Sequence, residues 1–377
     1  MKFNTKCVHG SGKPDSTGAI SPAIYMSSTF THPGLGETTG FQYTRESNPT
    51  RDRLETLIAG LEEGTDAIAF SSGMAAVDAV FHLFSPGDHV ILGDDLYGGS
   101  IRLFTNIYEK NGVEFTYVGT SDLDAVQAAF KPNTKAVYIE TPTNPMMEIT
   151  DVRALSKMAH DRNALVIVDN TFLSPYFQKP LHLGADIVVH SGTKFIGGHH
   201  DVISGFTIVK DDELAAQLRL IYKTVGACLS AFDSWLVIRG IKTLALRMEQ
   251  HQKNAIALAE WLKQEPKVTK VLFTGLPEHP GYEVNKSQTT GFGGMLSFEV
   301  DSEETAKQVL EGIQLIQFAE SLGGTESLLT YPVTQTHPDL KPEDAARKGI
   351  TRRLLRLSVG IEDTDDLIAD LAQAFNK

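Results

Sequence analysis

Short runs of apolar residues alternate with helical stretches from about residue 52 to residue 220. Residues 51–64 place apolar side chains at the spacing of an amphipathic helix. Strands that are apolar on both faces and separated by helices are typical of a parallel sheet covered on two sides. This region is therefore predicted to be an α/β sheet domain. Its predicted strands are DAIAF (66–70), HVILG (89–93), KAVYIE (135–140), ALVIVDN (164–170), DIVVHS (186–191) and GFTIVK (205–210).

The two flanks of this region have different patterns. The N-terminal 45 residues show no sustained helical or strand period, which predicts an irregular arm that packs on something else. The C-terminal part alternates between helical and strand-like segments, at about 243–264, 293–300, 303–312 and 354–360, before a final helix. We therefore predict an arm (1–45), an α/β domain (46–245) and a smaller α+β domain (246–377).

The charge balance narrows the class of function. The 34 basic and 47 acidic residues give a net charge of −13, which disfavours binding to nucleic acids or anionic membranes. The N-terminus lacks an apolar core segment and no window has the roughly 20 apolar residues of a membrane span, so we expect neither secretion nor insertion. Cys7 and Cys228 suggest neither a disulfide framework nor a metal site. We expect a cytoplasmic protein that acts on small molecules.

Polar residues that follow the apolar runs receive most weight, because ligands in open α/β sheets bind outside the carboxyl ends of the strands. After run 66–70 comes Ser71-Ser72-Gly73-Met74 and a helical stretch, which together predict a phosphate site at a helix N-terminus. An ordinary capped turn is the alternative.

Run 164–170 places Asp169 directly after four apolar residues, where a carboxylate needs a partner. A metal ligand, a structural ion pair and a partner for a pyridinium remain open for Asp169.

The segment after run 186–191 adds a reactive amine. Lys194 is flanked by hydroxyls and glycines in Ser191-Gly192-Thr193-Lys194 and lies 25 residues after Asp169. Pyridoxal phosphate (PLP) needs a lysine for a Schiff base, a carboxylate for its ring nitrogen and a phosphate pocket, and three strand ends offer these. His190, His199 and His200 lack the spacing of a metal motif, so we assign no metal.

These residues resemble the Cys/Met-metabolism enzymes that depend on PLP, and the resemblance covers almost the whole chain. It implies the fold of the aspartate aminotransferase type (fold type I), with a large domain whose sheet is mainly parallel and a smaller α+β domain. The matching segments are YTRESNPTR (43–51), SSGMAA (71–76), DDLYGG (94–99), ETPTNP (140–145), VDNT (168–171), SGTK (191–194), AESLGG (319–324) and RLSVG (356–360).

The resemblance implies a role for each of the candidate site residues. Lys194 would hold PLP and act as general base, Asp169 would hold the ring nitrogen, and Tyr97 would stack on the ring and take part in catalysis. The phosphate would be bound by Gly73, Met74, Ser191 and Thr193, and by Tyr43 and Arg45 of a neighbouring subunit. The substrate carboxylate would be bound by Arg356, Asn144 and Ser321. A core aromatic is the alternative for Tyr97, and an interdomain ion pair is the alternative for Arg356.

Four peripheral features of the sequence bear on the substrate. Gly99 stands where methionine γ-lyases carry a cysteine, and Glu320 matches an acidic residue of cystathionine γ-lyases and γ-synthases that can meet a distal ammonium group. The string at 47–51, with no tryptophan near Ser321, departs from enterobacterial β-lyases, while Gln42 replaces an acidic residue common in γ-lyases and γ-synthases. The resemblance therefore favours a cystathionine γ-lyase.

That enzyme would convert L-cystathionine to cysteine, 2-oxobutanoate and ammonia, a transsulfuration step of cysteine and methionine metabolism, with secondary β-elimination from cystathionine or cysteine that releases hydrogen sulfide. Cystathionine γ-synthase and cystathionine β-lyase are the alternatives within the family. A non-catalytic PLP-binding oligomer is the alternative of another class. A homotetramer, formed as a dimer of dimers, is the assembly that the resemblance implies.

Overall fold

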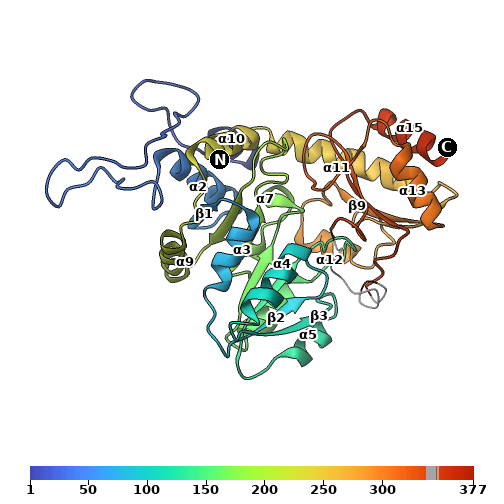
Figure 1. Cartoon of the computed structure of the whole chain (residues 1–377), viewed down its shortest axis with the longest axis horizontal. Coiled ribbons are helices and arrows are strands. Elements are labelled where there is room, and N and C mark those ends of the chain that lie inside the picture. Colours follow the sequence, from blue (N-terminus) through green and yellow to red (C-terminus); the bar gives the residue numbers. More distant parts are fainter. Residues whose placement is uncertain (337–344, 346–347) are drawn as a thin grey trace.

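The structure is a computed structural model that describes residues 1–336, 345 and 348–377. Figure 1 shows two sheet units side by side, with helix α11 (Leu244–Leu262) running from the first to the second. The α/β class predicted from the sequence is confirmed. None of the helices formed by the described residues has the length and apolar character that crossing a bilayer requires.

The larger sheet has the strand order β1-β7-β6-β5-β4-β2-β3. Among the described residues, β7 runs antiparallel to its neighbours β1 and β6, and the other pairs are parallel. All six runs predicted as strands are strands, and β3 at the edge was missed. The strands are β1 (Asp66–Phe70), β2 (His89–Gly93), β3 (Glu114–Val118), β4 (Thr134–Glu140), β5 (Leu165–Asp169), β6 (Ile187–Ser191) and β7 (Gly205–Val209).

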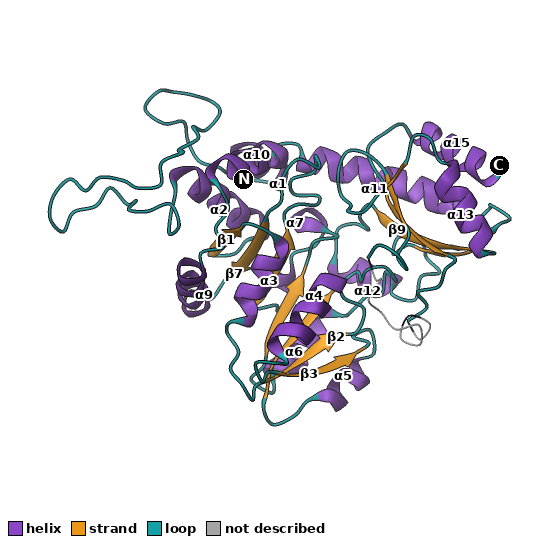
Figure 2. Ribbon diagram, viewed as in Figure 1, coloured by secondary structure: helices purple, strands orange, loops and turns teal. Residues whose placement is uncertain are grey.

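Helices cover both faces of this sheet, as its apolar strands require (Figure 2). Alternate residues of a strand point to opposite faces: Val137 and Val166 pack on one side, Tyr138 and Ile167 on the other. One face is covered by α2 (Pro49–Glu62), α5 (Leu123–Ala129), α6 (Val152–His160), α7 (Ser174–Phe177), α8 (Pro180–Leu183) and α10 (Ala231–Ile241). The other is covered by α3 (Gly73–Phe81), α4 (Gly98–Leu103), the π-helical turn η1 (Phe104–Tyr108) and α9 (Asp212–Val225).

The smaller sheet has the order β10-β11-β12-β9-β8 and is antiparallel except for the β10–β11 pair. Its core is closed by α13 and α15 together with the C-terminal half of α11. We propose the domain boundary near the start of α11, as the sequence suggested. The remaining elements are β8 (Val268–Leu272), α12 (Tyr282–Gln288), β9 (Met295–Val300), α13 (Glu303–Gly312), β10 (Gln317–Phe318), β11 (Leu328–Thr330), β12 (Leu354–Ser358) and α15 (Thr364–Phe375).

The N-terminal segment is only partly the irregular arm that was predicted. Residues Phe3–His9 form helix α1, and Cys7 on this helix is buried in the same hydrophobic core as Leu57 of α2. The prediction of no helix here was wrong, because seven residues are too few to show a period. The chain that follows projects away from the body as long loops, seen in dark blue in Figure 1. Its exposed apolar side chains include Ile20, Met26 and Leu35.

Candidate active site

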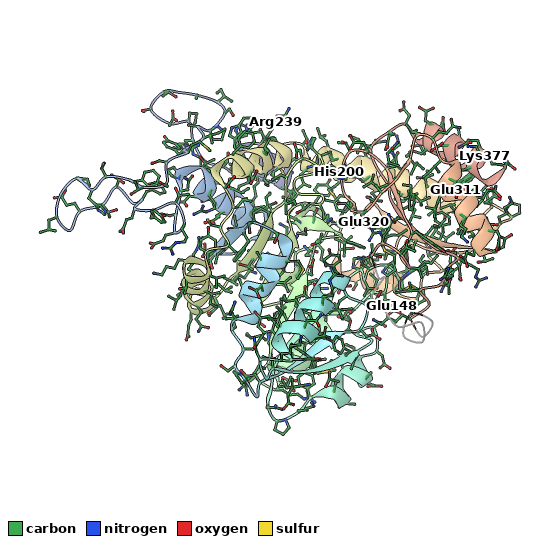
Figure 3. All side chains as sticks on the ribbon, viewed as in Figure 1. Glu148, His200, Arg239, Glu311, Glu320 and Lys377 are labelled. Carbon is green, nitrogen blue, oxygen red and sulfur yellow. The ribbon has the colours of Figure 1, made fainter. Side chains whose placement is uncertain are left out.

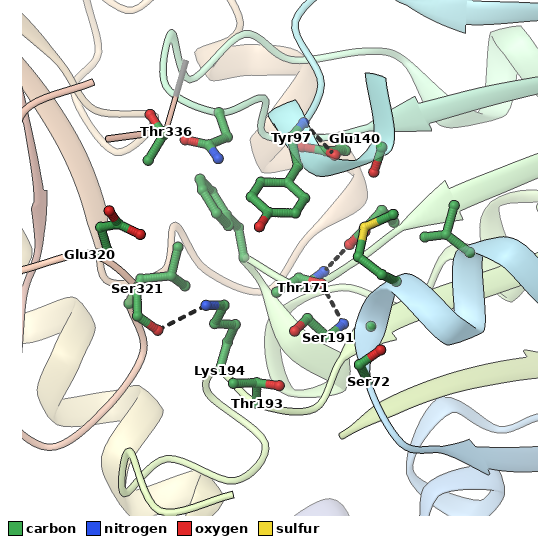
Figure 4. Close-up of a pocket in the computed structure, with 18 of the residues that line it drawn as sticks. Ser72, Tyr97, Glu140, Thr171, Ser191, Thr193, Lys194, Glu320, Ser321 and Thr336 are labelled. Atoms are coloured by element: carbon green, nitrogen blue, oxygen red, sulfur yellow. Dashed lines mark hydrogen bonds between the residues drawn. The ribbon is translucent and has the colours of Figure 1, made fainter. Parts of the chain in front are cut away.

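A cavity of about 370 Å³ lies where the carboxyl ends of the central strands of the larger sheet face the smaller sheet. Glu140, Asp169 and Ser191, at the ends of β4, β5 and β6, line it from the larger sheet, and Arg356 of β12 lines it from the smaller one. The cavity brings together all the predicted site residues except Tyr43 and Arg45. The close-up in Figure 4 shows Lys194 between Tyr97 on one side and Ser321 on the other.

Lys194 projects its amine into this cavity from the loop that follows β6. The Nζ atom donates a hydrogen bond to Oγ of Ser321 at 2.8 Å. Burial, together with the positive charge of Arg356, lowers the pKa of Lys194 to about 8. A neutral amine is the nucleophilic form, so this environment activates Lys194 near neutral pH.

Ser321, the partner of Lys194, has a strained backbone. Its φ of 86° lies in the left-handed region that favours glycine, a conformation that costs on the order of 1–3 kcal/mol for other residues. Its carbonyl accepts from Nη2 of Arg356 at 2.9 Å while its hydroxyl accepts from Lys194. Ser321 therefore connects the amine to the guanidinium, and this double contact holds the strained conformation.

Arg356 is a buried cation whose donors are only partly used. Nη1 donates to Oδ1 of Asn144 at 2.9 Å, and Nη2 donates to the Ser321 carbonyl at 2.9 Å and to the Thr330 hydroxyl at 3.1 Å. Among the described residues, Nε has no hydrogen-bond partner. Arg356 is 1% exposed and burial lowers its pKa to about 10. Three contacts thus orient a guanidinium that keeps donors for an anionic ligand.

Asp169 is a carboxylate that lines the cavity without a cationic side chain within ion-pair distance among the described residues. Its Oδ1 accepts from the backbone N–H of Thr171 at 2.9 Å, and burial raises its pKa. Thr171 also accepts from the backbone N–H of Ser191 at 2.9 Å, so one threonine ties together the ends of β5 and β6. A ligand with a positive charge would supply the partner that Asp169 lacks.

Tyr97 stands at the opposite wall, immediately before helix α4. Its backbone N–H donates to Oε1 of Glu140 at 2.9 Å, and the residue is 43% exposed and lines the cavity. A Cβ atom at Gly99 would lie 2.4 Å from Cε1 of Tyr97 and 3.1 Å from the sulfur of Met74. A cysteine at position 99 would therefore displace the Tyr97 ring, and glycine leaves it room.

The start of helix α3 forms the floor of the cavity. Ser72 caps the helix by accepting from the backbone N–H of Ala75 at 3.0 Å, and the first N–H groups of a helix lack helical partners. A Cβ at Gly73 would lie 2.9 Å from Cβ of Ser191, so glycine permits the close approach of α3 to β6. The Thr193 hydroxyl also reaches the cavity, but it donates to the carbonyl of Ser204 at 3.2 Å.

Tyr43 and Arg45 lie outside the cavity of their own chain. The Arg45 guanidinium lies over the Tyr43 ring at 5.5 Å and donates to the carbonyl of Lys223 in α9. Both side chains are exposed at the base of the projecting loops. A role for them in phosphate binding by a neighbouring subunit stays a prediction.

Two contributors were missed by the sequence reasoning. Glu140 ends β4 as Asp169 ends β5, and it is buried at 8% exposure. Burial raises its pKa well above the ordinary value, and the charge of Asp169 adds to this effect. The second missed residue is Thr171, two residues after Asp169. Asp169 was selected because it is a polar residue at the end of an apolar strand, and the same criterion would have selected Glu140 and drawn attention to Thr171. Both lie inside matching segments already quoted, so the signal was present and unused.

The chain matches a known protein family over almost its whole length. The description "Cys/Met metabolism PLP-dependent enzyme" belongs to a family model that matches residues 4–376. The chain belongs to this family. The prediction of the family and of PLP as its cofactor is therefore confirmed.

Proteins named for different activities of this family are similar to the chain to nearly the same degree. Cystathionine beta-lyase of Lactococcus lactis subsp. cremoris (strain MG1363) is 48% identical over 376 residues, covering 100% of this chain and 99% of that protein. Cystathionine gamma-synthase of Haemophilus influenzae is 50% identical over 367 residues, covering 97% of this chain and 95% of that protein. The crystal structure of cystathionine gamma-lyase from Lactobacillus plantarum complexed with L-serine has a TM-score of 0.98 at 46% identity, covering 100% of this chain and 99% of that one.

The cavity fits the cofactor of the family in three independent respects. It has an amine with a lowered pKa at Lys194, a carboxylate that lacks a cationic partner at Asp169, and the start of helix α3 at Gly73 in its lining. We propose that these groups hold the aldehyde carbon, the ring nitrogen and the phosphate of PLP, respectively.

We expect the capture of PLP by the apoprotein to depend on pH through Lys194. Only the neutral amine attacks the cofactor aldehyde, so the rate should rise about tenfold per pH unit below the Lys194 pKa of about 8 and level off above it. Mixing apoprotein with PLP and following absorbance at a series of pH values gives this profile. Glu320 raises the pKa of Lys194, so Glu320→Gln should move the midpoint to lower pH. A profile without a midpoint between about pH 7 and 9 would contradict the assignment of Lys194.

Proposed function

We propose that this protein is a cystathionine γ-lyase, which cleaves L-cystathionine by α,γ-elimination and consumes one water molecule to give cysteine, 2-oxobutanoate and ammonia. The observation that carries the proposal is one cavity that combines Lys194, Arg356 and Glu320. Lys194 reaches the α-carbon, Arg356 holds the α-carboxylate, and Glu320 offers a negative charge to the far ammonium of the substrate. Figure 3 shows Glu320 near the middle of the molecule, between the two sheet units.

The residues divide the chemistry among them. When bound, PLP supplies an electron sink that stabilises negative charge at the carbon atoms being deprotonated. The Nζ atom of Lys194 takes the proton from the α-carbon, and the Ser321 hydroxyl, 2.8 Å away, keeps this amine oriented. Asp169 keeps a proton on the ring nitrogen. The Tyr97 hydroxyl delivers a proton to the departing thiolate, and Glu140 fixes the backbone from which Tyr97 projects.

Substrate binding uses the oriented guanidinium of Arg356. Asn144, Ser321 and Thr330 hold it from one side, which leaves Nε–H for the substrate carboxylate. We propose that the phosphate of PLP is bound by the backbone N–H groups of Gly73 and Met74 and by the hydroxyls of Ser191 and Thr193. For the last of these contacts the Thr193 hydroxyl must turn away from Ser204.

We also propose that Tyr43 and Arg45 of a neighbouring subunit complete the phosphate site, in a homotetramer built as a dimer of dimers. The exposed apolar side chains of the projecting loops, such as Ile20 and Leu35, are consistent with packing on another copy. A place in the cytoplasm, and secondary β-elimination that releases hydrogen sulfide, belong to the same proposal.

Product analysis with L-cystathionine as the only substrate tests the proposed reaction. Formation of 2-oxobutanoate and cysteine would support α,γ-elimination. Formation of pyruvate and homocysteine would show a β-lyase instead. Turnover only of an acylated homoserine with cysteine would show a γ-synthase. Relatives with both of these names are similar to the chain, so both outcomes are worth testing. A purified protein that stays colourless after PLP is added would exclude all three activities.

We expect Glu320→Ala to discriminate between substrates of different length. Cystathionine has a distal ammonium group and cysteine does not, so kcat/KM should fall for cystathionine by roughly 10- to 100-fold, the value of one charge-assisted hydrogen bond, and by less than about twofold for cysteine. Steady-state kinetics with both substrates measures this. Glu326→Ala, an exposed neighbour on the same loop, is the matched control. Equal losses for the two substrates would exclude a specificity contact at Glu320.

A further inference from the structure

Helix α11 carries three buried polar residues on one face, at the spacing of successive helical turns. They are Arg247, His251 and Asn254, which are 3%, 0% and 0% exposed, and we call them the α11 ladder. Residues four and three positions apart lie on the same side of a helix, so the three side chains point the same way. The proposed reaction gives none of them a role, although polar groups this deeply buried are costly without good partners.

Arg247 binds the backbone immediately after Lys194. Its Nη1 donates to the carbonyl of Phe195 at 2.7 Å, and its Nη2 donates to the carbonyls of Ile196 at 3.4 Å and Gly240 at 2.9 Å. Among the described residues no carboxylate forms an ion pair with this guanidinium, and burial lowers its pKa to about 10. Its Nε donates to the hydroxyl of Thr243, one turn earlier in the chain, at 3.1 Å. Arg247 is thus a buried cation that binds backbone carbonyls of the Lys194 loop and of α10, and one hydroxyl.

His251 and Asn254 bind the backbone that follows Arg356 on the smaller sheet. The Nδ1 atom of His251 donates to the carbonyl of Val359 at 2.7 Å, since a carbonyl can only accept. Asn254 donates through Nδ2 to the carbonyls of Gly360 at 3.1 Å and Glu362 at 2.7 Å. Burial lowers the pKa of His251 to about 4, so the ring stays neutral in this tautomer.

The contacts made by Arg247 and those made by His251 come together around Phe195. The His251 ring packs edge-on against the Phe195 ring, with centroids 5.2 Å apart and planes at 78°. A Cβ at Gly323, within the AESLGG segment (319–324), would lie 2.6 Å from the backbone nitrogen of Phe195. A Cβ at Gly198 would lie 2.0 Å from Nη1 of Arg247. The Lys194 loop is therefore held between α11 and the smaller unit, with glycines where the contacts are tightest.

We propose that the α11 ladder is a positioning device that fixes the separation between Lys194 and Arg356. An α-amino acid carries its amino group and its carboxylate on the same carbon, so the groups that act on these two ends must keep one spacing. Misplacement by about 1 Å can cost on the order of 100-fold in rate. Arg247 sets the Lys194 side of this spacing and His251, with Asn254, sets the Arg356 side. The inference rests on the roles proposed above for Lys194 and Arg356.

The test compares how the PLP-loaded protein binds L-alanine and ethylamine, followed by the absorbance of the cofactor. The two ligands share the amino group, and only L-alanine has a carboxylate. The dissociation constant of ethylamine divided by that of L-alanine therefore measures how strongly Arg356 binds the carboxylate. Arg356→Leu gives the value of this ratio without that contact. We expect His251→Leu to lower the ratio at least about tenfold through weaker L-alanine binding, with ethylamine binding unchanged. We expect Arg247→Met to weaken both ligands and to speed the loss of PLP on dialysis.

Two kinds of control separate positioning from a general loss of stability. Leu258→Ala, on the same helix but in the core of the smaller unit, should lower the Tm and leave the ratio as in the wild type. His251→Gln and Arg247→Lys keep a donor and should recover most of the effect. A wild-type ratio in His251→Leu, or a ratio in His251→Gln as low as in His251→Leu, would overturn the proposal. Absence of cystathionine turnover by the wild type would instead overturn the proposed function, and the binding ratio would still be measurable.

Discussion

Lys194→Ala should give a protein that no longer holds PLP covalently and has lost on the order of 1,000-fold or more in kcat, the scale of a general base. The variant removes the amine that is hydrogen-bonded to Ser321 and whose pKa burial lowers to about 8. Borohydride treatment followed by mass spectrometry should fix the cofactor to the wild-type peptide that contains Lys194, and the variant should lose its absorbance on dialysis.

Two control variants for Lys194→Ala keep the positive charge at position 194 or remove a lysine elsewhere. Lys194→Arg keeps a positive charge but offers a guanidinium that does not form a Schiff base at neutral pH, so it should be as inactive as the alanine variant. Lys157→Ala, at an exposed lysine that pairs with Asp161, should behave as the wild type. A borohydride-stable adduct on any lysine other than Lys194 would contradict the assignment.

Arg356→Leu should weaken amino-acid substrates strongly while leaving the retention of PLP nearly intact. Removing one partner of a buried charge pair costs about 2–5 kcal/mol, which is roughly 30-fold to several thousand-fold in kcat/KM. The loss has two sources: the substrate carboxylate loses its cation, and the Ser321 carbonyl and Asn144 lose the donors they bind at 2.9 Å. Steady-state kinetics with cystathionine, and the retention of PLP on dialysis, measure the two predictions separately.

Arg356→Lys and Arg353→Met are the matched variants for this position. Lysine keeps the charge but cannot contact Asn144, Ser321, Thr330 and a carboxylate together, so it should recover only a small part of the activity. Arg353 lies three residues earlier, where its exposed side chain pairs with Glu299, and Arg353→Met should have little effect on kinetics. If Arg356→Leu lowered the Tm without changing the preference for a ligand with a carboxylate, Arg356 would be a structural residue.

The features that the sequence predicted are those with a local signature. Asp169 directly follows the apolar residues of β5, and Lys194 follows the apolar residues of β6 in a segment of hydroxyls and glycines. Ligands of open α/β sheets bind at the carboxyl ends of the strands, so both residues were expected at the same edge of the sheet. Strands β1 and β2 begin and end where the apolar runs do. The direction of β7 was not predictable, because direction depends on the connection before a strand rather than on its own residues. Edge strand β3 was missed because its side chains are mostly half-buried or exposed.

The α11 ladder shows a different reason for failure. The sequence predicted the helix itself within two residues at each end, from about 243–264 against Leu244–Leu262. Its polar residues Arg247, His251 and Asn254 look like a solvated helix face until the partners are known. Those partners are backbone carbonyls at Phe195 and Val359, which carry no signal in the sequence. Contacts between a side chain and a distant backbone are therefore what sequence reasoning alone leaves out.

The two carboxylates at the ends of β4 and β5 bear on how the protein survives in a cell. Burial raises the pKa of both Asp169 and Glu140, and each lies near the other without a cationic side chain in ion-pair contact among the described residues. A cofactor whose ring nitrogen is protonated supplies the missing positive charge, so its binding stabilises the folded chain by mass action. Molecules that have lost the cofactor should open more often and be degraded sooner by proteases. The abundance of this enzyme should then follow the supply of vitamin B6.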